Sequence, residues 1–123
     1  MRNRFGTALN CIDGRTQIPV TEWLKVQYGL VDLITEPGMD RVLSHGPACE
    51  VARLRENTIV SLTAYASQVI AVVGHFDCAA NPVSKCQHFK DIATSTQVVR
   101  SWGFAHVIGL WVDEYGRIEV VCT

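Results

Sequence analysis

Several features that would point to a particular class of partner are missing from this sequence of 123 residues. No stretch reaches the roughly 18 consecutive apolar residues of a membrane-spanning helix. Basic and acidic side chains nearly balance, at 11 and 12, and the formal net charge is -1. We therefore expect no nucleic-acid partner and no membrane partner. The first six residues carry charge without a long apolar run behind them, which is untypical of a secretory signal and predicts a cytoplasmic protein.

The cysteine content also argues against a disulfide framework. An odd count without a secretory signal is more typical of metal-binding or catalytic thiolates than of structural bridges. Any one cysteine, taken alone, is more often a small buried hydrophobic residue, and we expect this of Cys49 and Cys122. The five cysteines are Cys11, Cys49, Cys78, Cys86 and Cys122.

The order of apolar segments and turn residues predicts an α/β fold in a single domain over residues 1–123. Strands alternate with helices as β-α-β-α-β-α-β-β, which favours a three-layer α/β/α architecture with a mostly parallel sheet. The predicted strand order is 2-1-3-4 plus an antiparallel edge strand. We expect strands over residues 7–12, 30–35, 69–73, 106–112 and 117–122, helices over 19–28, 48–67 and 82–102, with Asn81 as a cap, and a loop with a helical turn over 39–45.

Two groups of chemically active side chains follow two of the predicted strands. Cys11, Asp13 and Arg15 come at the carboxyl end of the first strand, and His75 and Cys78 at the carboxyl end of the third. Ligand crevices of open α/β sheets lie at these ends, where the strand order reverses. If the first strand pairs with the third, the two groups meet. Two thiolates and one imidazole suit Zn²⁺ and leave a fourth position for water, as in catalytic zinc sites.

Asp13 admits two roles beside such a metal. Two residues apart on extended backbone, Asp13 and Arg15 can point the same way. Paired with Arg15, Asp13 stays ionised and can accept a hydrogen bond from water on the metal. Alternatively, Asp13 itself takes the fourth position and closes the site.

Blander interpretations exist for each group taken alone. Cys11 could be a core residue, with Asp13 and Arg15 in a solvated turn. A rival metal site could form from His75, Cys78, Cys86 and His88, whose spacing resembles a zinc finger. However, Cys86 and His88 fall nearly opposite each other around the predicted helix, because two residues turn it by about 200°.

The motif Cys11-x-Asp13-x-Arg15, followed by Gly74-His75-x-x-Cys78, resembles the β-class carbonic anhydrases over most of the chain, and more closely a compact group of proposed carbonic anhydrases within them. The resemblance implies a zinc lyase that reversibly hydrates carbon dioxide to bicarbonate through a zinc-bound hydroxide. It implies Cys11, His75 and Cys78 as metal ligands and Asp13 and Arg15 as the catalytic pair. It also implies a homodimer or larger homo-oligomer, because neighbouring subunits complete the cleft in that family. For proton export, His88 is a candidate.

The sequence also departs from the family pattern. Gly14 stands where Ser is usual, Ala79 replaces a Gly, and Thr35-Glu36-Pro37-Gly38 replaces Arg-Asn-Ala-Gly. We expect the amino-terminal helical arm and the upstream active-site glutamine of the family to have no counterpart here. These differences leave the metal ligands in place and bear on rate and substrate. Two alternatives therefore stay open: a zinc hydrolase of carbonyl sulfide or carbon disulfide, and a zinc-binding protein without turnover.

Overall fold

The computed structural model describes residues 4–123 of the chain. Strands and helices alternate along most of it, as the apolar pattern predicts. The elements are β1 (Phe5–Asn10), α1 (Gly14–Tyr28), β2 (Leu30–Thr35), α2 (Met39–His45), α3 (Ala48–Tyr65), β3 (Ile70–His75), α4 (Lys85–Arg100), β4 (Val107–Val112) and β5 (Ile118–Cys122).

The strands form one sheet in the order β2-β1-β3-β4-β5. The first four are parallel, and β5 pairs antiparallel with β4 through a hairpin. The predicted α/β fold class and strand order are thereby confirmed. Because β1 lies between β2 and β3, the chain reverses its direction of growth there, and the carboxyl ends of β1 and β3 become neighbours.

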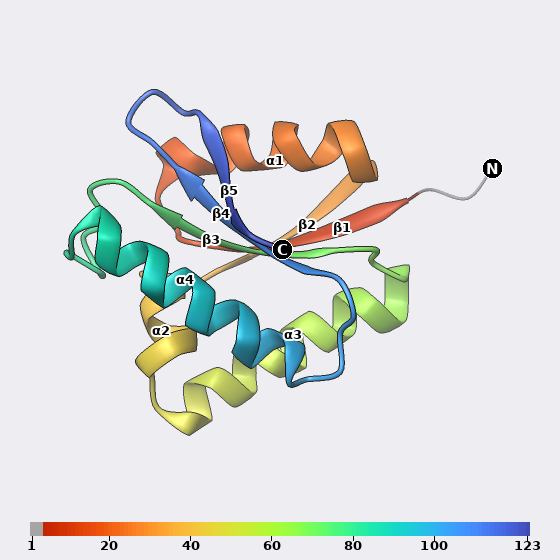
Figure 1. Cartoon of the computed structure of the whole chain (residues 1–123). Coiled ribbons are helices and arrows are strands. Elements are labelled where there is room, and N and C mark those ends of the chain that lie inside the picture. The colour runs from red at the N-terminus through yellow and green to blue at the C-terminus, as the bar shows by residue number, and fades with distance from the viewer. Residues whose placement is uncertain (1–3) are drawn as a thin grey trace.

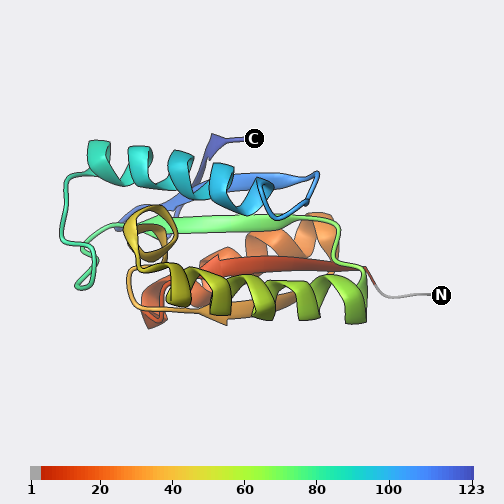
Figure 2. The same ribbon diagram turned by 90° about the horizontal axis from the view of Figure 1, so that it is seen from below.

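The sheet is covered on both faces (Figure 1). Helix α1 lies on one face, and α2, α3 and α4 lie on the other, as the view in Figure 2 also shows. Alternate residues of the central strands supply the two cores, because side chains of a strand point to opposite faces in turn. Ala71 and Val73 of β3 pack towards α1, with Val20 and Leu24. Ile70 and Val72 belong to the opposite core, which includes Leu54 and Val99.

Helix α1 begins earlier than predicted. The sequence indicated a turn at residues 13–16 and a helix from Pro19, but the structure has helix from Gly14, with Pro19 inside it. The reason is a cap: the Asp13 side chain accepts a hydrogen bond from the Arg15 backbone N–H at 2.9 Å. An Asp before a helix satisfies one of its free N–H groups and favours a start at this point.

Helix α4 begins later than predicted. Ser84 is its cap and accepts from the Gln87 backbone N–H at 3.1 Å, so that the helix runs over Lys85–Arg100. Asn81, the predicted cap, is instead buried among polar side chains. The segment expected as a loop with a helical turn forms the seven-residue helix α2.

Further differences concern the burial of two cysteines and the end of α3. Cys49, predicted to be buried, is exposed, and Cys122 is half-buried. Helix α3 ends at Tyr65 rather than at residue 67, where Ala66 adopts a left-handed conformation with a φ of 53°. Within residues 4–123, no helix is both long and apolar enough to cross a membrane.

Candidate metal centre

Cys11, His75 and Cys78 come together at the carboxyl end of the sheet. Cys11 directly follows β1, His75 is the last residue of β3, and Cys78 lies in the loop beyond it. Their sulfur and nitrogen ligand atoms all lie within 4.8 Å of one another. The side chains are buried, with exposed fractions of 5%, 1% and 3%. The β1–β3 pairing that the sequence analysis assumed thus brings both groups to one place.

The imidazole of His75 has one nitrogen satisfied and one free. Nδ1 lies 2.6 Å from the Phe76 carbonyl oxygen, to which it donates as the protonated nitrogen. Nε2 is the one buried side-chain nitrogen or oxygen in the described part of the chain that lacks a hydrogen-bond partner. A buried polar atom without a partner is costly, and a metal-ligating His typically donates its other nitrogen to a carbonyl or carboxylate. The donor set therefore fits a zinc ion.

The two thiols contact each other, and their pKa values shift in opposite directions. The hydrogen bond from Cys78 lowers the pKa of Cys11, and the same contact raises the pKa of Cys78. One proton between two sulfurs leaves a thiolate, which is the form that binds metal. Burial disfavours the charged imidazolium of His75, but the neighbouring Cys11 thiolate outweighs this and raises the pKa of His75. Negative charge thus gathers where a cation would sit.

Asp13 and Arg15 form a two-point ion pair at the rim of this cluster. Arg15 Nε donates to Asp13 Oδ1 at 3.0 Å, and Nη2 donates to Oδ2 at 2.6 Å. The Arg15 guanidinium holds the pKa of Asp13 at about 2, so the carboxylate is charged. Their predicted proximity is correct, but the predicted reason holds for one residue only: Asp13 is a helix cap with extended backbone, whereas Arg15 lies in the first turn of α1.

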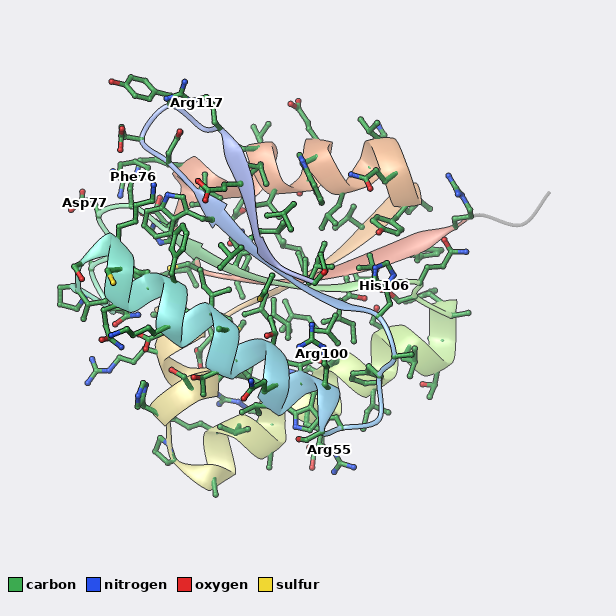
Figure 3. All side chains as sticks on the ribbon, in the orientation of Figure 1. Arg55, Phe76, Asp77, Arg100, His106 and Arg117 are labelled. Atoms are coloured by element: carbon green, nitrogen blue, oxygen red, sulfur yellow. The ribbon has the colours of Figure 1, made fainter. Side chains whose placement is uncertain are left out.

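Arg15 also reaches the loop that carries Cys78. Its Nη2 donates to the Asp77 carbonyl oxygen at 3.2 Å, and its guanidinium lies 4.5 Å from the centre of the Phe76 ring. Asp77 has a φ of 47°, a left-handed conformation that Asp tolerates better than most residues. Figure 3 shows Phe76 and Asp77 at the same end of the molecule as Arg117 of the β4–β5 hairpin. Sequence reasoning missed Asp77, although an Asp within a tight loop next to a ligand is a usable signal.

The rival set of ligands does not assemble. Cys86 is exposed, and His88 is buried, with its Nδ1 2.6 Å from Asp40 Oδ2. His88 is therefore not a surface helix residue, and its hydrogen bond ties it to α2 rather than to the metal cluster. Among the residues from 4 onwards, the cluster of potential metal ligands contains Cys11, His75 and Cys78, and Asp13 is outside it.

Known structures share this fold. The β-carbonic anhydrase isoform I of Trichomonas vaginalis is 16% identical, with a TM-score of 0.69 over 99% of this chain and 85% of its own. A carbonic anhydrase from Streptococcus mutans is 14% identical, with a TM-score of 0.65 over 98% of this chain and 83% of its own. Identities this low show the fold alone, so the structural class is that of the β-carbonic anhydrases. No curated protein sequence matches the chain.

The match at family level is more specific. The family described as "Putative carbonic anhydrase" matches residues 1–122, and the chain belongs to it. Membership of this family supports a lyase of the carbonate dehydratase type, in agreement with the resemblance noted in the sequence.

Proposed function

We propose that this protein is a zinc-dependent carbonic anhydrase that reversibly hydrates carbon dioxide to bicarbonate, with zinc held by Cys11, His75 and Cys78. The observation that carries the proposal is a buried cluster of Cys11, His75 and Cys78 whose ligand atoms lie within 4.8 Å of one another, in which His75 Nε2 has no hydrogen-bond partner. Family membership supports the choice of reaction.

The neighbouring residues suit this reaction. Zinc in a catalytic site supplies a Lewis acid that brings the pKa of a water from 15.7 to about 7. Asp13 is a charged acceptor at the rim and would hold the proton of the attacking water in a fixed direction. Arg15 contacts both carboxylate oxygens and keeps Asp13 charged. Both oxygens are engaged by Arg15 and Asp13 is outside the ligand cluster, which supports an open fourth position rather than a closed one.

Two measurements test the proposal together. Elemental analysis of freshly purified protein should give about one zinc per chain, and stopped-flow hydration of carbon dioxide should show activity that rises between about pH 7 and 9. Protein with no zinc would contradict the metal site. Protein with zinc but no hydration would contradict the reaction and leave the site standing.

The same preparation separates the alternative substrates. Carbonyl sulfide and carbon disulfide present the same kind of carbon to the site, so their hydrolysis should be assayed beside carbon dioxide hydration. We expect carbon dioxide to be the fastest of the three. Faster turnover of a sulfur compound would identify a hydrolase, and no turnover of any of them would identify a zinc-binding protein without activity.

We also propose that the protein acts as one domain over residues 1–123 and forms a homodimer or larger homo-oligomer in the cytoplasm. Support for association comes from the edge strand β2, where Leu30 and Leu33 expose 45% and 36% of their surfaces. Unpaired edges with apolar side chains favour pairing. Two β-carbonic anhydrases of Sordaria macrospora with this fold, at 14% identity and a TM-score of 0.52, are tetrameric. A stable monomer in sedimentation at micromolar concentration would contradict the proposed association.

The proposed cytoplasmic location is compatible with the cysteines. All five are free, as is usual in a reducing compartment.

A further inference from the structure

A second buried polar cluster lies between α2 and α4, and we call it the Asn81 network. It consists of Asp40, Asn81, His88 and Asp91, each exposing 3% of its surface or less. Asn81 Nδ2 donates to Asp40 Oδ1 and to Asp91 Oδ2, both at 3.1 Å. His88 Nδ1 donates to Asp40 Oδ2 at 2.6 Å. The network thus joins the first turn of α2, the loop before α4, and α4 itself.

Every carboxylate oxygen of this network has a donor. Asp91 Oδ1, the remaining one, accepts from Gln87 Nε2 at 2.8 Å. The Asp40 backbone oxygen accepts from Ser95 at 2.9 Å, which fixes the same turn of α2. Buried carboxylates are costly unless they are hydrogen-bonded, and a fully satisfied network of this kind holds its elements rigidly.

One of the two segments that the network joins contains the turn after Cys78, and the other, at Gly38, packs against that turn. The Asn81 backbone N–H donates to the Cys78 carbonyl oxygen at 3.3 Å and so closes the turn that carries Cys78. The backbone N–H of Gly38, two residues before Asp40, helps to lower the pKa of Cys11. The segments also touch directly: Gly38 has a φ of 61°, and a Cβ there would lie 3.0 Å from Ala80. A side chain at position 38 would push the two segments apart.

We propose that the Asn81 network is a positioning device for the metal cluster: it holds Gly38 and the loop of Ala80 and Asn81 in register, so that the turn that carries Cys78 stays beside Cys11. This inference rests on the proposed zinc site. Hydrogen bonds to a thiolate stabilise its charge and orient it towards the metal, and loss of such outer contacts typically weakens metal affinity by about 10- to 100-fold.

A matched pair of variants at His88 tests the inference. His88→Asn retains a side-chain nitrogen at about the position of Nδ1, whereas His88→Leu removes the donor to Asp40 Oδ2. We expect His88→Leu to lose zinc to a competing chelator about 10- to 100-fold more readily than the wild type, and His88→Asn to stay within about threefold. In cobalt-substituted protein, the thiolate-to-cobalt absorption should shift in His88→Leu. Ser61→Ala removes a buried hydroxyl bound to Thr7 and Asp32 and is the control.

A measurement without metal separates this inference from the proposed function. In zinc-free protein, the amide hydrogens of Gly38, Ala80 and Asn81 should exchange faster in His88→Leu than in wild type, while those of β3 stay protected. A folded His88→Leu with wild-type zinc retention, cobalt spectrum and amide exchange would overturn the positioning role while the zinc site stands. A wild type that binds no zinc would overturn both proposals.

A milder variant serves if His88→Leu does not fold. Gln87→Met removes only the half-buried donor to Asp91 Oδ1. Zinc retention should fall by more than about threefold, because the loss of a hydrogen bond around the metal ligands weakens metal affinity. Unchanged retention and unchanged amide exchange at Gly38 would overturn the inference.

Discussion

The metal cluster and the Asn81 network are both buried, both polar and both at the same end of the sheet, yet they differ in one respect. In the metal cluster, His75 Nε2 has no partner. In the Asn81 network, each carboxylate oxygen accepts a hydrogen bond. Since unpaired buried polar atoms are costly, the first arrangement is complete only with a ligand, and the second is complete without one. Satisfaction of hydrogen bonds therefore distinguishes a binding site from a structural polar core.

The largest effect should come from removing the two thiols of the metal cluster. In Cys11→Ser with Cys78→Ser, zinc should fall from about one per chain to near zero, because Ser is a neutral and much weaker ligand than thiolate. Elemental analysis measures the result. Cys86→Ser, at an exposed cysteine, is the matched control and should keep its zinc. Zinc unchanged in the double variant would place the metal elsewhere.

In the metal-free protein, a substitution in the Asn81 network should cost more stability than a substitution in the metal cluster. Asn81→Leu leaves two buried carboxylates without their shared donor and should lower the free energy of unfolding by about 3 kcal/mol, the scale of a broken buried polar contact. Cys78→Ala, which removes one sulfur from the metal cluster, should cost about 1 kcal/mol. Urea unfolding of metal-free protein gives both values, and equal losses would abolish the distinction drawn above.

Arg15 should matter for rate more than for stability. Arg15→Ala releases the carboxylate of Asp13 and should lower kcat/KM for carbon dioxide hydration by about 10- to 100-fold, with little change in Tm. Arg15→Lys should also be impaired, because an ammonium cannot contact both oxygens of Asp13 in one plane. Asp77→Asn removes a carboxylate charge 3.4 Å from the same guanidinium but keeps the backbone carbonyl that accepts from Arg15, so it should lower the rate less than Arg15→Ala does. If Arg15→Ala unfolds while its folded fraction keeps full activity, the pair is structural.

The smallest expected effect is the pH dependence of the stability that the Asp13 charge contributes. The pKa of Asp13 is lowered from 3.8 to about 2, so its charge contributes stability that is complete above pH 3.8 and disappears as the pH falls through about 2. Asp13→Asn keeps the capping shape and removes the charge. At pH 6 the variant should be less stable by about 1 kcal/mol or less, since partly exposed ion pairs are screened, and the difference should shrink towards zero near pH 2. Urea unfolding at the two pH values tests this, and a constant difference would show that charge is not the cause.

Much of the fold was predictable because it depends on local patterns. The apolar run at residues 69–73 predicted the central strand, and Leu30–Thr35 was predicted with its observed bounds. The starts of α1 and α4 were missed, because a cap depends on which polar side chain reaches a free N–H group. The side chains of Asp13 and Ser84 accept from such N–H groups. Asn81 is instead buried and hydrogen-bonded to Asp40 and Asp91.

The sequence by itself determined which chemical groups are available at this site: two thiols, an imidazole and an Asp–Arg pair at the ends of two strands that the predicted strand order makes neighbours. Only the tertiary structure decided how these groups are held. Asp40 lies 41 residues from Asn81 and 48 residues from His88 along the chain and meets them only in the folded protein. In the same way, Asp77 meets Arg15 across 62 residues of sequence. The physical reason is that burial and hydrogen-bond partners arise from long-range packing, whereas ligand identity and strand pattern are properties of short segments.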